Sequence, residues 1–171
     1  MNMRIVVLAT VLGGVMLISV SAAIVWPPVL IWNASAGVPI GLYYVKPEER
    51  LEVTDLVVVT PPEPVARFLA ERDYLPRGVP LLKRVLALPG QTVCRNRLAI
   101  MIDGVVMATA RERDHRGRPL PVWQGCQLIA EGQVFLMNWQ SADSLDGRYF
   151  GPLPVASILG RAAPLWTFEE P

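Results

Sequence analysis

The stretch Pro80-Leu-Leu-Lys-Arg-Val-Leu-Ala-Leu-Pro-Gly90 is typical of a short buried β-strand that ends in a turn. Most of its side chains are aliphatic. Because successive strand residues point to opposite faces, Lys83 and Arg84 lie on opposite faces, and one of these two cations points towards the apolar side. The strand therefore brings a basic group into the domain interior.

Similar short apolar runs follow one another along the chain, separated by turn residues. They predict strands at 55–60, 98–108, 133–138 and 155–166, and the second of these is a hairpin that turns at Asp103-Gly104. Residues 65–72 predict one or two turns of helix, the only helix expected in this part of the chain. Short strands with frequent turns and little helix predict an all-β domain.

The N-terminal segment has a different character. Residues 5–26 carry no charge and are long enough to cross a hydrocarbon core as a helix. We therefore predict a membrane anchor over residues 1–28 and an outer β-rich domain over 29–171. Arg4 is the only charge before the apolar segment, which predicts a cytoplasmic N-terminus. The alternative is a cleavable signal peptide, because Ser21-Ala22-Ala23 is a small-residue run of the kind found at cleavage sites.

The composition limits the possible partners. The 171 residues include 16 basic and 15 acidic side chains, for a formal net charge of +1. Nucleic-acid binding requires a basic surplus on one face, so no nucleic-acid partner is predicted. The hydrophobic content of 52% is high for a soluble domain and reflects the N-terminal segment in large part.

Cys94 and Cys126 are the two cysteines of the chain. In an oxidising compartment they can form one disulfide, worth about 3 kcal/mol for a loop of this length, and the alternative is a pair of buried thiols. Their spacing fits no zinc motif, and the chain has one histidine. We therefore predict neither a metal site nor a cofactor.

Lysine is rare in this sequence. Lys46 and Lys83 are the only two, so 14 of the 16 basic residues are arginine. A desolvated lysine has a lowered pKa and can act as a general base near neutral pH, whereas arginine stays charged. The alternative for Lys83 is an amine that reaches solvent from a strand edge. The single histidine, His115, lies in the charged run 111–118, which predicts a solvated loop.

Asp146 and Arg148 lie in the turn-rich stretch 141–152 and can form a structural ion pair. Three stretches then indicate a family when they are taken in order. They are Asn33-Ala-Ser-Ala-Gly-Val-Pro-Ile-Gly-Leu-Tyr43, the stretch 80–90 and Ser144-Leu-Asp-Gly-Arg-Tyr-Phe-Gly151. Together with the anchor they resemble the signal peptidase I family of serine–lysine proteases, in particular its conjugative-transfer branch, which matures pilin precursors.

This resemblance implies a role for several residues. It makes Lys83 the general base and Ser144 the hydroxyl that orients it. It also gives Asp146 and Arg148 as site support, Ser35 as an oxyanion-hole hydroxyl, and Val38 and Pro39 as substrate-binding residues. In such a site a neutral lysine deprotonates a serine, which attacks the scissile carbonyl to form an acyl-enzyme.

The sequence departs from the family pattern at the nucleophile. The branch pattern is Asn-x-Ser-x-Ser-aliphatic-Pro, and Gly37 stands at the second serine. Ser35 is a poor replacement, because two residues along an extended chain shift a side chain by about 6–7 Å. Three explanations are open for Gly37: an introduced knock-out, a naturally inactive paralogue, or a sequence change that the fold tolerates.

The sequence thus predicts a membrane-bound endopeptidase scaffold for exported precursors, impaired by Gly37, in the bacterial inner membrane with its domain in the periplasm. Its expected partners are a precursor peptide or pilin subunit and membrane lipid. The alternative is a catalytically dead precursor-binding protein of the same fold. Trp26, Trp32 and Tyr43 are expected either at the membrane interface or packed within the domain.

Overall fold

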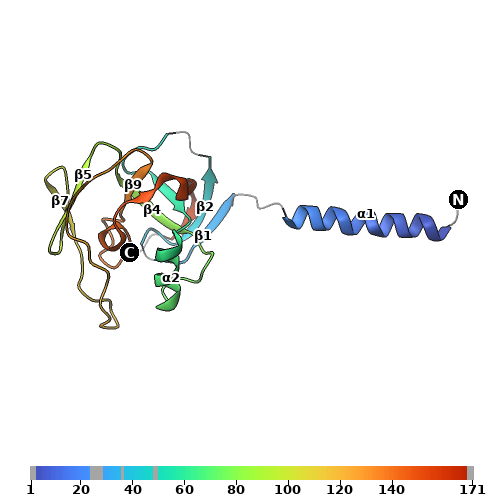
Figure 1. The fold of residues 1–171 in the computed structure, drawn as a ribbon, viewed down its shortest axis with the longest axis horizontal. Helices are drawn as coiled ribbons and strands as arrows, with labels where there is room; N and C mark the ends of the chain where they lie inside the picture. Colours follow the sequence, from blue (N-terminus) through green and yellow to red (C-terminus); the bar gives the residue numbers. More distant parts are fainter. Residues whose placement is uncertain (1–2, 24–28, 36, 48–49, 169–171) are drawn as a thin grey trace.

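The computed structural model describes residues 3–23, 29–35, 37–47 and 50–168. Helix α1 spans Met3–Ala23 and extends away from the strands (Figure 1). Its window Met3–Val20 has a mean hydropathy of 2.2 and buries nothing against the rest of the chain, so its length and composition allow it to cross a membrane. Residues 24–28 of the expected anchor lie outside the described residues.

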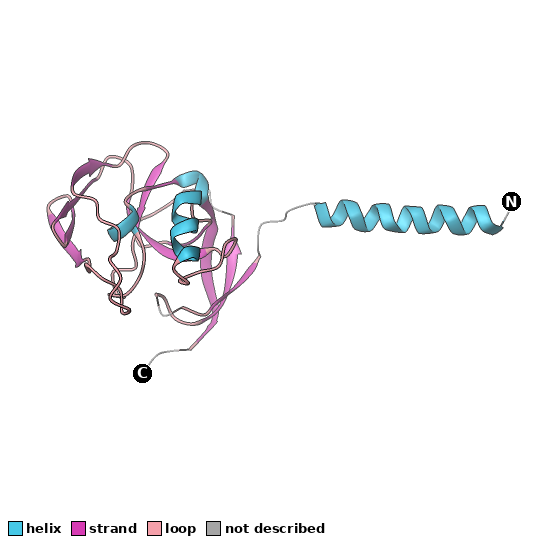
Figure 2. Ribbon diagram, turned by 60° about the horizontal axis from the view of Figure 1, so that its bottom comes forward, coloured by secondary structure: helices cyan, strands magenta, loops and turns pink. Residues whose placement is uncertain are grey.

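The other described segments form two antiparallel sheets (Figures 1 and 2). The larger has seven strands in the order β1-β2-β11-β3-β4-β9-β10, and the smaller has four in the order β7-β6-β5-β8. The strand bounds of the larger sheet are Leu30–Asn33, Gly41–Lys46, Ile158–Thr167, Leu56–Val59, Leu81–Ala87, Gln133–Leu136 and Leu153–Pro154. Those of the smaller sheet are Val105–Thr109, Ala99–Ile102, Thr92–Asn96 and Gly125–Leu128. The all-β fold class predicted from the sequence is confirmed.

Most of the predicted strands are present. β3, β4 and β9 lie within the expected runs, and β11 covers most of its run and ends one residue beyond it. β6 and β7 form the expected hairpin with Asp103 and Gly104 at positive φ. The prediction missed β5 and β8, which are short and rich in polar residues. It also did not assign β1 and β2 as strands, since residues 29–32 form only a short apolar run and glycine and proline punctuate residues 33–43.

The helices require one correction. Helix α2, Glu63–Glu71, matches the predicted helix closely. It is not alone outside α1, since the described part of the chain also contains α3 at Gly147–Phe150 and a 3-10 turn, η1, at Val155–Ser157. Helix α3 is only one turn long, and it begins where the Asp146 carboxylate accepts a hydrogen bond from the Arg148 amide. A single capped turn of this kind has no periodicity for a sequence pattern to reveal.

Strand β4 lies near the centre of the larger sheet, between β3 and β9. Lys83 is paired with Val57, and Val57 and Val85, two of its neighbours on the same face, are fully buried. Lys83 itself is only 8% exposed, whereas Arg84 is partly exposed. Lysine is therefore the cation that the strand turns inward.

The smaller sheet carries the disulfide. Cys94 of β5 and Cys126 of β8 lie directly opposite each other, and their sulfur atoms are bonded. Of the two alternatives left open by the sequence, the structure contains the bonded form. The bond joins two cysteines that are 32 residues apart in the chain.

The aromatic residues expected near the membrane do not all behave alike. Tyr43 is buried in the core, and its hydroxyl donates to the Pro39 carbonyl at 2.6 Å. Trp32 is 53% exposed. Trp26 lies outside the described residues. Of the two environments considered for these residues, Tyr43 therefore packs within the domain.

Candidate active site

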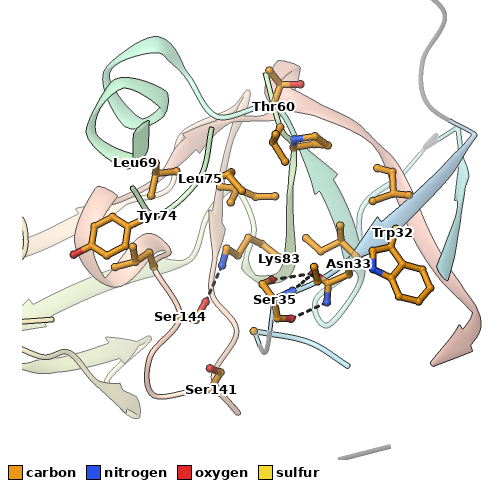
Figure 3. Close-up of a pocket in the computed structure, with 18 of the residues that line it drawn as sticks. Trp32, Asn33, Ser35, Thr60, Leu69, Tyr74, Leu75, Lys83, Ser141 and Ser144 are labelled. Atoms are coloured by element: carbon orange, nitrogen blue, oxygen red, sulfur yellow. Dashed lines mark hydrogen bonds between the residues drawn. The ribbon is translucent and has the colours of Figure 1, made fainter. Parts of the chain in front are cut away.

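A groove of about 830 Å³ crosses one face of the larger sheet (Figure 3). One wall comes from β1 and the turn after it, another from the segment between α2 and β4, and the third from the loop 141–145. Lys83 points into this groove from β4, between Ser35 and Ser144. The structure thus brings together three segments that are far apart in the sequence.

Lys83 is held as a desolvated amine. Its Nζ atom donates to the Ser144 hydroxyl at 2.7 Å. Burial lowers the pKa of Lys83 from 10.5 to about 8, the nearby Asp146 carboxylate opposes this shift, and the Arg148 guanidinium adds to it. The amine therefore loses its proton within reach of neutral pH, as a general base requires.

Gly37 faces this amine. A Cβ atom built on Gly37 lies 3.9 Å from Lys83 Nζ and 3.6 Å from the Ser144 hydroxyl oxygen. A side chain at position 37 would therefore point at both groups. The same Cβ lies 3.0 Å from Asn138 Nδ2, so that amide must move by a few tenths of an ångström to admit a side chain.

Asn33 holds the turn that carries position 37. Its Nδ2 donates to the carbonyls of Ser35, Val38 and Pro39 at 2.8–3.1 Å. Its Oδ1 accepts from the backbone amide and the hydroxyl of Ser35. Sequence reasoning quoted Asn33 without giving it a role, although an asparagine two residues before a serine in a turn-rich stretch is typical of such local bonding.

Val38 and Pro39 lie differently from the substrate-binding role that the resemblance implies. Val38 is 6% exposed and packs in the core with Tyr43 and Leu82. Pro39 is exposed, and neither residue is among the described residues that line the groove. What they contribute to the site is the shape of the turn, through carbonyls that Asn33 and Tyr43 bind.

Asp146 and Arg148 form a buried ion pair beneath the loop 141–145. Their closest atoms are 2.8 Å apart, and the side chains are 0% and 1% exposed. Arg148 Nη2 also donates to the carbonyls of Ser141 and Ser144, at 2.7 and 3.3 Å. The pair therefore shapes the loop that presents Ser144 to Lys83.

Three further residues belong to this neighbourhood and were missed from the sequence. Asn138 is 1% exposed and bonds to the backbone of β4. Arg95 is equally buried and donates from Nη1 to the Arg148 carbonyl at 2.6 Å. Tyr74 lines the groove. The available signal was a polar side chain at the end of an apolar run, which applies to Asn138 but not to Arg95 or Tyr74.

The charged loop 111–118 is more ordered than the solvated segment that its composition predicts. The Asp114 carboxylate accepts hydrogen bonds from Tyr74 and from the backbone and side chain of Arg118. Partial desolvation opposes ionisation, but these bonds hold the pKa of Asp114 well below its usual range. The loop therefore supports the groove wall at Tyr74, while His115 is exposed and does not reach the groove.

Metal ligation has no obvious place in this arrangement. Within the described ranges, no three histidine, cysteine, aspartate or glutamate side chains gather closely enough to hold an ion. What the site can do is proton transfer: a lysine amine of lowered pKa, a hydroxyl that orients it, and a third position for a side chain in front of both.

Comparison with known proteins identifies a family. A family described as "Signal peptidase, peptidase S26" matches residues 3–166. The chain therefore belongs to the signal peptidase S26 family, a class of peptidases.

The relatives place the chain within this family. It is 37% identical to the conjugal transfer protein TraF of Agrobacterium fabrum over 148 residues, covering 80% of this chain and 82% of the relative. It is 31% identical to the plasmid transfer protein TraF of Escherichia coli, again covering 80% and 82%. A probable signal peptidase I-1 of Synechocystis is 33% identical, covering 65% and 52%. A solved signal peptidase I of Enterococcus faecalis has 20% identity and a TM-score of 0.39, covering 66% of this chain and 97% of the other.

Proposed function

We propose that this chain is a membrane-anchored serine–lysine endopeptidase scaffold that binds exported precursors during conjugative transfer and lacks its attacking hydroxyl at Gly37. One observation carries the proposal: the Cβ direction of Gly37 leads to Lys83 Nζ and the Ser144 hydroxyl, which are already hydrogen-bonded to each other. The family supports the reaction class, and the names of the conjugal-transfer relatives support the setting.

The reaction of a chain with serine at position 37 follows from these contacts. The neutral amine of Lys83 takes the proton of the serine hydroxyl, and the oxygen attacks the scissile carbonyl to form an ester. The protonated lysine returns the proton to the leaving amine, and a water then hydrolyses the ester by the same route. In this proposal Ser144 orients the lysine, and Ser35 exchanges its bond to Asn33 for one to the oxyanion.

The proposed topology follows from α1. Residues 1–28 anchor the chain in the inner membrane with the N-terminus in the cytoplasm, and residues 29–171 form the periplasmic domain. A bonded Cys94–Cys126 pair suits an oxidising compartment such as the periplasm. A precursor that is still held in the membrane by its apolar segment then meets the groove at the membrane surface.

Restoring the hydroxyl tests the proposal. Gly37→Ser in the full chain, reconstituted in lipid, is expected to cleave a pilin-type precursor with small residues before the cut, as measured by gel mobility and mass spectrometry. Adding Lys83→Ala to this variant should reduce the rate by about 10²–10⁴-fold, because the general base is lost. A correctly folded Gly37→Ser chain that cleaves no such precursor would contradict the proposal.

The second candidate is a precursor-binding protein without catalysis. Its specific support is that the groove is intact while the attacking side chain is absent. The chain with Gly37 is then expected to bind an uncleaved precursor without forming a covalent adduct. Val79→Arg on the groove wall should weaken this binding, whereas Val105→Arg on the distant strand β7 should not.

A further inference from the structure

Asn138 continues a strand pairing with its side chain. Strand β9 ends at Leu136, and beyond it the Met137 amide still donates to the Arg84 carbonyl of β4 at 2.9 Å. At the next residue the side-chain amide takes over: Asn138 Oδ1 accepts from the Arg84 backbone amide at 3.0 Å, and Nδ2 donates to the Leu82 carbonyl at 3.1 Å. These two bonds hold the peptide groups on either side of Lys83.

The backbone of Asn138 connects the same point to the buried ion pair. Its amide donates to Asp146 Oδ2 at 3.1 Å, and its carbonyl accepts from Arg148 Nη2 at 3.3 Å. This pair shapes the loop that carries Ser144, the hydroxyl bonded to Lys83. Asn138 thus fixes the backbone of Lys83 relative to Ser144, the residue that binds the Lys83 amine.

Asn138 also touches the third part of the site. Its Nδ2 lies 3.0 Å from the position of a Cβ atom at Gly37. The residue is 1% exposed and is not among the described residues that line the groove, so it contacts all three parts of the site without facing a bound peptide.

We propose that Asn138 is a positioning residue whose side-chain amide holds strand β4 on both sides of Lys83 and so fixes where the lysine amine points. The proposal rests on the proposed function, because aiming the amine matters only where the amine reacts. Its structural part can still be measured in the chain with Gly37, without any catalysis.

Removing the side-chain amide of Asn138 is expected to increase the hydration of the Lys83 amine. Asn138→Ala leaves the Arg84 amide and the Leu82 carbonyl without partners in a buried cavity, and a water that binds them also hydrates the neighbouring amine. Hydration favours the charged form, so the pKa of Lys83 should rise. The other charged groups near the amine, Asp146 and Arg148, keep their mutual bonds in this variant.

The scarcity of lysine makes a direct measurement possible. In a Lys46→Arg background, a chain labelled with ¹³C at lysine Cε gives one lysine signal, that of Lys83. Its titration in detergent micelles reports the pKa of Lys83. Asn138→Ala should shift this pKa upward by about half a unit or more. Asn138→Ser, which keeps a hydroxyl that can bind one of the two peptides, should shift it less and in the same direction.

Gln91→Ala is the matched control. Gln91 is another amide side chain whose oxygen accepts from a backbone amide, that of Leu88 just beyond the other end of β4, at 3.0 Å. The Gln91→Ala variant should leave the pKa of Lys83 unchanged, even if the substitution lowers the unfolding temperature. If both Asn138 variants fold and the titration does not move, Asn138 is a structural residue and the proposal is wrong.

A kinetic measurement separates this proposal from the proposed function. In the Gly37→Ser background, Asn138→Ala should lower kcat by about tenfold or more while KM changes little, because the groove is untouched. The acid limb of the pH–rate profile should move to higher pH, in step with the raised pKa of Lys83. If the Gly37→Ser chain is inert but Asn138→Ala still shifts the pKa of Lys83, only the proposed function is contradicted. If the Gly37→Ser chain is active and Asn138→Ala changes neither kcat nor the pH profile, the role of Asn138 is contradicted.

Discussion

Lys83 shows how much a single residue depends on its position in the fold. Its neighbours Val57 and Val85 are fully buried, and Ser144 is bonded to its amine. Burial of a cation opposes folding unless the charge is removed or compensated. At Lys83 it is partly removed, since the pKa falls from 10.5 to about 8.

This lowered pKa predicts how stability depends on pH. Below pH 8 the lysine is charged in both the folded and the unfolded chain, so the burial penalty is present in full. Between pH 8 and 10.5 the unfolded chain holds a proton that the folded chain has lost, and the free energy of unfolding rises with pH by about 3 kcal/mol in total.

Lys83→Met should therefore stabilise the chain at low pH. Methionine has similar length and no charge. The free energy of unfolding of the variant is therefore expected to exceed that of the parent by about 1–3 kcal/mol at pH 6, where the burial penalty is present. At pH 10 the difference should largely disappear. Urea titrations at the two pH values measure it. A variant that is less stable than the parent at pH 6 would show that Asp146 compensates the charge fully.

At the scale of elements, the turn around α3 depends on one ion pair. Asp146 caps the helix, and Arg148 binds both this carboxylate and the carbonyls of Ser141 and Ser144. These contacts bring a loop with few apolar side chains into a fixed conformation. The element therefore owes its structure to charge and hydrogen bonding more than to burial of apolar surface.

Arg148→Met is expected to destabilise the chain by about 3–5 kcal/mol, because it leaves the Asp146 carboxylate buried without a partner. Arg111→Met is the control, since the Arg111–Asp143 pair has a similar distance of 2.8 Å but side chains that are 48% and 73% exposed. That variant should change the stability by less than about 1 kcal/mol. Equal losses in the two urea titrations would argue against a special role of the buried pair.

At the scale of the whole molecule, an aromatic cluster lies on β1 and at the C-terminal end of β11. Trp32, Trp166 and Phe168 contact one another with ring centroids 4.5–6.3 Å apart, yet each is about half exposed. Strand β1 carries Trp32 and lies at the end of the domain nearest α1 (Figure 1). Tryptophan is favoured at the headgroup level of a bilayer. We therefore expect this cluster to meet the membrane.

Fluorescence quenching by brominated lipids checks this expectation. In full chains with a single tryptophan, Trp32 and Trp166 should be quenched by lipids brominated close to the headgroup. Trp123 is the control, because it packs against Phe135 in the domain and donates to the Gly147 carbonyl at 3.0 Å. If Trp32 and Trp166 are quenched no more than Trp123, the expectation is wrong.

The sequence by itself determined the elements that rest on local pattern. Hydrophobic periodicity and turn residues act over a few neighbouring positions. They predict the apolar run of α1, the strands β3, β4 and β9, and the hairpin of β6 and β7. It also determined that one of Lys83 and Arg84 points inward, because strand alternation allows nothing else. Ordered motifs placed the chain in its family before any contact was known.

Only the tertiary structure decided what surrounds these residues. Asn138, Tyr74 and Arg95 reach the site through pairings between distant segments, which no local pattern encodes. The same holds for Val38, which the fold turns into the core and away from the groove. The lowered pKa of Lys83 is also a tertiary property, because desolvation depends on every segment that excludes water from the amine.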